Sequence, residues 1–157
     1  MLLPQQLENL KSIFAQRSAM RPVKSWLPVQ NPARSDQILE LQSRRSNHYY
    51  FLPVSPEKKV IPYIPHDLFL FVVPTFAPGK IYCGAPYDSQ AATSRLIKPV
   101  SGHTSLCEGK DVFFAGEIEF QRGRMVSWSN NSGHYMPPAK LIYTNLIPAI
   151  RLMLPMS

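Results

Sequence analysis

Hydrophobic and polar residues alternate most regularly between Val112 and Phe120. Phe114, Ile118 and Phe120 occupy one set of alternate positions, whereas the glutamates of this segment fall on the other. A period of two predicts a strand with one buried face. A second strand, Arg124–Ser129, follows after Gln121-Arg122-Gly123. This spacing predicts a β-hairpin with a three-residue loop in which Gly123 takes a positive φ.

The three-residue loop also predicts the register of the hairpin. It pairs Phe120 with Arg124, Ile118 with Val126 and Gly116 with Trp128. The indole of Trp128 is then expected to cover the bare backbone at Gly116, as aromatic residues do opposite strand glycines. The other face, which we expect to be wet or to line a groove, carries Glu117, Glu119, Ser127 and Ser129.

Helical periodicity is found near both ends of the chain. In the segment Pro4–Ala19 an apolar stripe predicts an amphipathic helix that packs on the rest of the protein, or else docks on a partner or serves export. The stripe consists of Leu7, Leu10, Ile13 and Phe14. A last helix, Ala139–Met153, is expected to be kinked or split in two at Pro148. Its predicted buried face consists of Leu141, Ile142, Leu146, Ala149, Ile150 and Met153.

Between the first helix and the hairpin, prolines interrupt the chain at short intervals. Residues 21–32 are predicted to be an extended linker, and Ser35 or Asp36 is predicted to cap a short helix over 37–45. Short aromatic and branched runs then predict strands over residues 49–54, 60–64, 68–73 and from 80 to 83. A loop is predicted over 90–99, with one or two helical turns over 91–97 as the alternative. The run Leu68–Val73 is apolar on both faces, which predicts a central strand.

These elements predict an α+β fold in a single domain. An antiparallel sheet is flanked by an N-terminal helix and a Pro-kinked C-terminal helix. A helical, proline-rich region over residues 1–45 precedes a β-rich region over residues 46–157. The chain has 157 residues, 16 of them proline, and this length suits one hydrophobic core.

The net charge of +7 would suit nucleic acid or an acidic membrane surface as a partner. The basic residues are spread out, however, and only Arg44-Arg45 and Lys58-Lys59 are adjacent. Nucleic-acid binding therefore stays a minor alternative to a soluble basic surface. The chain has no apolar run long enough for a membrane span and starts without a signal-peptide pattern. We expect a protein that is cytoplasmic as synthesised, with secretion by a leaderless route as the open alternative.

The two cysteines, Cys83 and Cys107, form no CxxC motif and lie in no zinc-type spacing. Two free thiols are expected, with a single disulfide as the alternative, and no metal site is predicted. Cys83 is expected to be a core thiol. Cys107, near His103 in a polar segment, is the one candidate nucleophile. We expect His48 and the pair His66-Asp67 on the surface.

A series of short motifs runs from about residue 80 to 138. It consists of Ile81-Tyr82-Cys83-Gly84, His103–Gly109, Phe114-Ala115-Gly116-Glu117, Arg122-Gly123 and Ser132-Gly133-His134-Tyr135-Met136-Pro137. The series resembles the SGHY[RK]P-containing domain of plant IQ-motif-containing calmodulin-binding proteins and of bacterial toxin-like and effector-like proteins. Met136 stands where that pattern has a basic residue, and Cys107 replaces a small or apolar one. The chain has no IQ motif, so calmodulin binding is not implied.

The resemblance implies a shared fold and an effector setting, with a protein of a target cell as the partner. A catalytic site is hypothesised at His103, Glu117, His134 and Tyr135, since histidine and carboxylate side chains can exchange protons near neutral pH. A His, Tyr and Glu set is also similar to that of ADP-ribosyltransferases, which would make NAD a cofactor. Alternatively, His134 and Tyr135 lock the loop between hairpin and helix. A binding surface is predicted at Ser132, Gly133, Trp128 and Asn131.

Three functions follow from these observations. The first is a toxin- or effector-like protein that acts on a target-cell protein, with ADP-ribosyl transfer as its chemistry. The second is a non-catalytic interaction module that uses the SGHY loop and the polar hairpin face. The third is a basic nucleic-acid-binding protein.

Overall fold

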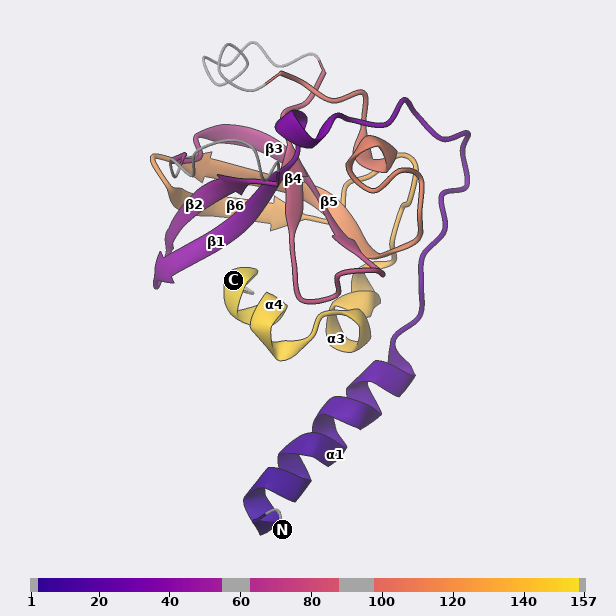
Figure 1. Ribbon diagram of the computed structural model, residues 1–157, viewed down its shortest axis with the longest axis vertical. Coiled ribbons are helices and arrows are strands. Elements are labelled where there is room, and N and C mark those ends of the chain that lie inside the picture. Colours follow the sequence, from indigo (N-terminus) through magenta and orange to yellow (C-terminus); the bar gives the residue numbers. More distant parts are fainter. Residues whose placement is uncertain (1–2, 55–62, 88–97, 156–157) are drawn as a thin grey trace.

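The computed structural model describes residues 3–54, 63–87 and 98–155, with the side chains of residues 12–19 left out (Figure 1). Its strands form one antiparallel sheet in the order β2-β1-β4-β3-β5-β6. The strands are β1 (Leu39–Arg45), β2 (His48–Pro53), β3 (Asp67–Pro74), β4 (Tyr82–Gly84), β5 (Val112–Gln121) and β6 (Arg124–Ser129). The helices are α1 (Pro4–Ala19), α3 (Ile142–Asn145) and α4 (Pro148–Met153), with 3₁₀ turns η1 (Ser35–Gln37), η2 (His103–Leu106) and η3 (Ala139–Leu141). The predicted α+β fold with an antiparallel sheet is confirmed.

Strand β3 lies in the middle of the sheet, between β4 and β5, and is covered on both faces. Phe69, Phe71 and Val73 point to one face, whereas Leu70 and Val72 point to the other. A strand that is apolar at every position must be covered on both sides, which is why this run alone could be placed at the centre of the sheet. The prediction of a central strand is confirmed.

Two apolar layers cover the sheet. The helix-side core packs the phenylalanines of β2, β3 and β5 against Leu146, Ile150 and Leu154 of the C-terminal segment, which lies under the sheet in Figure 1. The loop-side core packs Leu70, Val72 and Ala115 against a non-sheet layer formed by Val100, Leu106, Cys107 and Tyr135. The sheet therefore separates the C-terminal helices from the loops that carry most of the predicted site.

The sheet curls until its two outer strands meet. The N–H of Tyr49 on β2 donates to the carbonyl of Gly123 at 2.8 Å, and the N–H of Met125 on β6 donates to Oδ1 of Asn47 at 3.0 Å. These bonds connect the β1–β2 turn to the β5–β6 turn. Both turns therefore form one end of the molecule.

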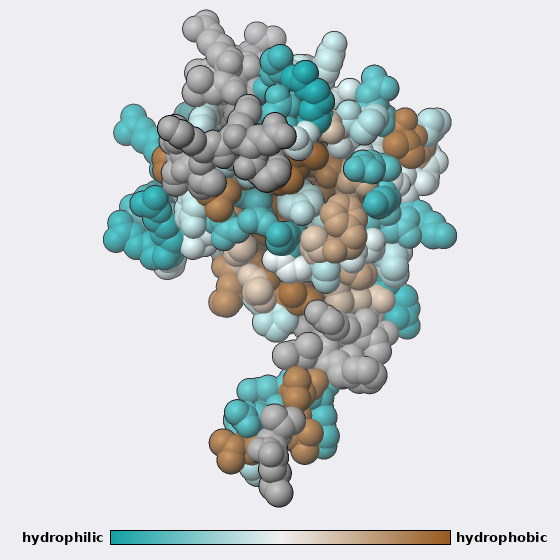
Figure 2. Space-filling model, in the orientation of Figure 1, coloured by the Kyte–Doolittle hydropathy of each residue, from teal (hydrophilic) through white to brown (hydrophobic). Residues whose placement is uncertain are grey.

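The N-terminal helix is confirmed, but it projects from the sheet and contacts the rest of the protein at α3 (Figure 1). Leu7 and Leu10 are 44% and 50% exposed, and Figure 2 shows hydrophobic side chains uncovered along this helix. The predicted packing role is thus wrong for these two residues, while Ile13 and Phe14 lie outside the described side chains.

The predicted linker after α1 is extended, as expected, but it is bonded along the loop-side face. Val23 forms a bridge with Val112, and the N–H groups of Trp26 and Ala33 donate to the carbonyls of His134 and Ser105 at 3.0 Å. Residues 21–34 therefore form a strap that holds the site loops down.

The helix predicted over residues 37–45 is wrong: a 3₁₀ turn over Ser35–Gln37 leads into strand β1. Leu39 and Leu41 are buried, while Glu40 and Gln42 between them are only half-buried. This is the two-residue period of a strand, and pairing with β2 and β4 on both sides outweighs the helical preference of Leu, Glu and Gln.

The hairpin is confirmed, but its predicted register is wrong. Gln121 pairs with Arg124 around a two-residue turn, Arg122-Gly123, in which both residues have positive φ. The third residue of the predicted loop is absent from the turn. An additional residue is instead accommodated in a β-bulge opposite Glu119 and Phe120, so that Ile118 pairs with Trp128. Consequently Val126 is 57% exposed rather than opposite Ile118 in the core.

The predicted cover of Gly116 by Trp128 is also wrong. A Cβ on Gly116 would lie 1.7 Å from the carbonyl oxygen of Ser129, so the neighbouring backbone itself occupies that space. Gly116 is required here for the close approach of two backbones.

The C-terminal helix is split at Pro148, one of the two predicted outcomes, and gives α3 and α4. Leu146 and Ile150 are fully buried, whereas Leu141, Ile142 and Met153 are partly buried and Ala149 is exposed, which corrects the predicted buried face. Most of the strand predicted over 60–64 and of the segment 90–99 lies outside the described residues, although Tyr63 pairs with Phe51 on β2.

Candidate functional site

His103 begins the 3₁₀ turn η2 and lies against strand β5. It is 7% exposed, and its Nε2–H donates to the carbonyl of Gly116 at 2.7 Å. Burial lowers the pKa of His103; the bond to Gly116 opposes this shift, and the nearby His134 adds to it. A histidine with a lowered pKa is neutral near pH 7. Its Nε2–H is used inside the fold, as a link between the loop layer and the sheet.

Tyr135 and Cys107 form a buried polar pair in the loop-side core. The hydroxyl of Tyr135 donates to the carbonyl of Lys110 at 2.7 Å and lies 3.1 Å from Sγ of Cys107. Burial raises the pKa of Tyr135, and burial also raises the pKa of Cys107 against the opposing bond from Tyr135. Both groups therefore stay protonated at neutral pH. A nucleophilic cysteine needs an exposed, lowered-pKa thiolate, so the structure gives Cys107 the opposite environment from the predicted one.

Glu117 and His134 are the more accessible members of the predicted catalytic set. Glu117 is half-buried, and its Oε1 accepts a hydrogen bond from Nδ2 of Asn131. His134 is half-buried, and its carbonyl accepts the N–H of Trp26 from the strap. The fold thus brings His103, Glu117 and His134 to one corner, next to the end of β6. The Nε2–H of His103 and the hydroxyl of Tyr135 are bonded within the protein.

The SGHY loop is held by its own hydrogen bonds. Oγ of Ser132, which is buried, accepts the N–H of Tyr135 at 3.3 Å, and its carbonyl accepts the N–H of Met136 at 2.8 Å. Gly133 is exposed, with no described neighbouring atom within 4 Å of the position of a Cβ. These bonds and that of the Tyr135 hydroxyl hold the loop, whereas the locking role predicted for the His134 ring stays a prediction. Asn131 and Gly133 are the exposed part of the loop.

Trp128, the fourth predicted binding residue, lies on the other face of the sheet. Its ring meets those of Phe71 and Phe114 edge-on, with centroids 6.5 and 6.0 Å apart. Its Nε1–H donates to the carbonyl of Pro155 at 2.8 Å, which ties the chain after α4 to β6. The structure therefore separates Trp128 from the buried side of the SGHY loop.

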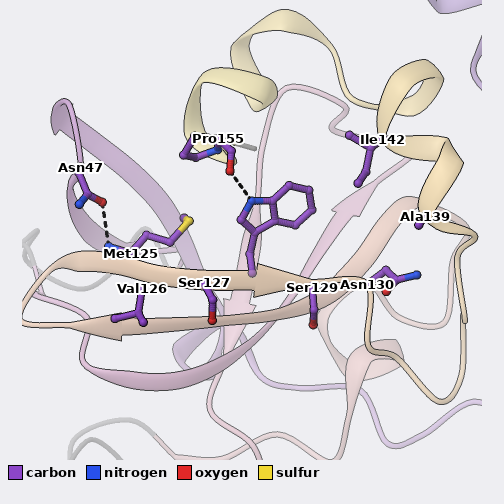
Figure 3. Close-up of a pocket in the computed structure, with 10 residues that line it drawn as sticks. Asn47, Met125, Val126, Ser127, Ser129, Asn130, Ala139, Ile142 and Pro155 are labelled. Carbon is purple, nitrogen blue, oxygen red and sulfur yellow. Dashed lines mark hydrogen bonds between the residues drawn. The ribbon is translucent and has the colours of Figure 1, made fainter. Parts of the chain in front are cut away.

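A groove of about 670 Å³ runs between β6 and the C-terminal segment (Figure 3). Figure 3 shows the side chain of Met125 on the same side of β6 as Ile142 and Pro155, with Val126 on the opposite side. The groove is lined by Asn47, Met125, Val126, Ser127, Trp128, Ser129, Asn130, Ala139, Ile142 and Pro155. None of the four predicted catalytic residues lines it. This volume is within the range typical of ligand-binding pockets.

Only part of this groove is predictable from the sequence. Trp128 is predicted in a binding surface, and Ser127 and Ser129 on a polar face, whereas no pattern places Asn47, Ile142 and Pro155 beside them. These three residues come from segments nearly 100 residues apart, and no local pattern signals that they meet. The one local signal is the adjacent pair Met125 and Val126, which puts an apolar residue on each face of a short strand.

The structure also bears on the two cysteines, on metal-type side-chain groups and on membrane spans. Both cysteines are free and buried, and Cys83 lies in the helix-side core as predicted. Among the described residues, no three His, Cys, Asp or Glu side chains are grouped as a metal site would require. Within the same residues, no helix is long and apolar enough to cross a membrane.

No family model, curated protein or solved structure gives a significant match to this chain. The resemblance to the SGHY[RK]P-containing domain therefore stays a prediction.

Proposed function

We propose that this protein is a non-catalytic interaction module that binds an extended segment of a partner protein in the groove beside β6. The observation that carries the proposal is the groove itself, which runs along the outer strand of the sheet and is lined by apolar and uncharged polar residues. An outer strand can pair with an added strand, and pockets beside it can select alternate side chains of that strand.

The chemistry of the groove specifies its occupant. Trp128, Ile142 and Pro155 provide an apolar wall, and no charged side chain of the described residues lines the groove. Met125, which is half-buried, lies on the side of β6 that faces Ile142 and Pro155, whereas Val126 points to the other side. Burying such surface stabilises a complex by about 25 cal/mol per Å² before the costs of association. An extended segment with apolar residues at alternate positions is the partner that fits.

The alternative proposal is an effector enzyme of ADP-ribosyltransferase type that uses NAD. It requires His103, Tyr135 and Glu117 to face a common substrate site. In the structure, the hydroxyl of Tyr135 and the Nε2–H of His103 are satisfied by backbone carbonyls. This is why we favour binding over catalysis; an effector setting suits a binding module equally well.

The groove is tested with peptides of about ten residues selected from a random display library against the whole chain. We expect Met125→Glu to weaken the selected peptides at least about tenfold, because Met125 lies on the side of β6 that faces Ile142 and Pro155 and the change puts a charge in the groove. Leu152→Glu is the matched control, since Leu152 is 83% exposed on α4 and does not line the groove. Equal affinity for a folded Met125→Glu variant and wild type, or an equal loss with the control, would contradict binding in the groove.

The enzymatic alternative is tested by expressing the chain in bacteria and yeast. Growth arrest by the wild type, but not by folded Glu117→Gln and His134→Ala variants, would replace the binding proposal with an enzymatic one. Equal growth of all three agrees with a module that binds.

A further inference from the structure

A second cavity, of about 400 Å³, lies between the two turns at one end of the sheet. Its polar lining comes from Arg44, Arg45, His48, Tyr50 and Arg122, with Gly123 beside them. In Figure 2, hydrophilic side chains gather at the corresponding end of the molecule, over the tips of β1 and β2. Two segments almost 80 residues apart therefore supply three arginines to one cavity.

The backbone explains how these arginines converge. A strand normally points adjacent residues to opposite faces, but the β1–β2 register is irregular between Ser43 and Arg45. Such a bulge allows Arg44 and Arg45 to line the same cavity. On the other side, Arg122 has φ 50° in its turn, and its N–H donates to Nδ1 of His66 at 3.0 Å. The bond between Tyr49 and Gly123 fixes one turn against the other.

The positive charge of this cavity is not neutralised within the part of the chain that the structure describes. None of its three guanidinium groups has a carboxylate partner there. The guanidinium of Arg44 lies over the ring of Tyr50, 5.2 Å from its centroid. The nearby acid Asp67 is paired with His66, with Oδ1 and Nε2 3.7 Å apart. The three arginines are exposed, and an anion bound between them would lower their mutual repulsion.

We propose that this cavity binds a phosphate monoester. Guanidinium groups bind phosphate oxygens through paired N–H donors, and several arginines converging on one point suit a dianion. A nucleic-acid backbone needs cations spaced along a track, since its charges are single and regularly repeated. Here three arginines line a single cavity rather than a track, which favours a terminal phosphate on a small molecule or on a phosphorylated side chain.

The site is independent of the groove proposed above, because Arg44, Arg45 and Arg122 do not line that groove. Failure of the peptide experiment would therefore leave this proposal intact, and failure here would leave the groove intact.

The test is a titration of the ¹⁵N-labelled chain with phenyl phosphate, at constant ionic strength. We expect saturable shifts confined to the amides of residues 44–50 and 122–124. Arg122→Asn and Arg45→Gln should each weaken binding about tenfold, whereas Lys140→Gln, an exposed cation outside the cavity, should not. Amide spectra of the free variants establish that each is folded.

Two further probes distinguish the source of the phosphate and the competing ligand class. Tighter binding of a phosphotyrosine peptide than of phenyl phosphate supports the proposal and assigns a phosphorylated protein as the source of the phosphate. Equal affinity for the two probes supports the proposal and assigns a phosphorylated small molecule as the ligand. Non-saturable shifts, shifts spread over the chain, or an equal loss in Lys140→Gln would overturn it. Binding of a twelve-residue thymidine oligonucleotide without binding of phenyl phosphate would overturn it in favour of nucleic acid.

Discussion

Replacing Gly116 by alanine should place a methyl group inside the neighbouring backbone. The new Cβ would lie 1.7 Å from the carbonyl oxygen of Ser129 and 2.7 Å from its carbonyl carbon. Real Cβ atoms do not approach other atoms closer than 3.0 Å, so β5 and the end of β6 must separate by about 1.3 Å. Backbone cannot rotate away as a flexible side chain can, and the separation must therefore disturb the bonds on both sides.

The cost can be worked from those bonds. Separation disturbs the last hairpin pair, Glu117 with Ser129, and shifts the carbonyl that accepts the Nε2–H of His103. Overpacking costs about 1–3 kcal/mol, and each lost hydrogen bond adds about 1 kcal/mol. With two interactions disturbed, we expect Gly116→Ala to lower the free energy of unfolding by about 3–5 kcal/mol. For a chain of this size that corresponds to a fall in Tm of about 10 °C.

Thermal and urea unfolding, followed by circular dichroism, measure this effect. Gly133→Ala is the matched control, because no described atom lies within 4 Å of its Cβ position, and it should change Tm by less than about 2 °C. If Gly116→Ala unfolds like the wild type, the backbone of Ser129 does not cross Gly116, and the pairing of Glu117 with Ser129 is wrong.

Three more predictions concern the buried polar groups and the turn. Asn145→Ala should lower the free energy of unfolding by about 2–4 kcal/mol and expose the N-terminal strap to proteolysis. The reason is that Nδ2 of Asn145 donates to the carbonyls of Arg21 and Phe113, while its Oδ1 accepts the Arg21 N–H. Urea unfolding measures the first effect and limited trypsin digestion the second. Because burial lowers the pKa of His103, the unfolded chain binds the proton more tightly, so stability is full above pH of about 6.5 and falls as the pH drops through the pKa of the folded state. Urea titrations between pH 7.5 and 5 should show a slope that His103→Gln reduces, and an unchanged slope would contradict a buried neutral histidine. Arg122→Asn should raise the free energy of unfolding by about 0.5–1 kcal/mol, since asparagine tolerates the positive φ of this turn better than arginine; a fall in Tm would contradict the turn.

The hydrophobic pattern by itself determined the fold class, the central strand and the hairpin. These are local consequences of sequence: a run such as Leu68–Val73 has no stable arrangement except between two apolar layers. Pro148 likewise had to interrupt the last helix, because it removes a donor and its ring clashes with the preceding turn. Short strands with mixed propensity are not determined by local preference. Residues 37–45 are predicted as a helix because Leu, Glu and Gln favour one, whereas pairing with both β2 and the distant β4 makes Leu39–Arg45 a strand.

Only the tertiary structure decided the hairpin register and the location of the candidate sites. The register depends on where one extra residue is placed, either in the turn or in a bulge within the strand. The amino-acid sequence of the hairpin is the same in both cases, so it does not decide between them. The roles of His103 and Tyr135 were decided by burial, since the same side chains are catalytic when exposed and structural when bonded to Gly116 and Lys110. The groove and the arginine cavity arise where the curled sheet brings distant segments together. No local sequence pattern predicts that these segments lie side by side.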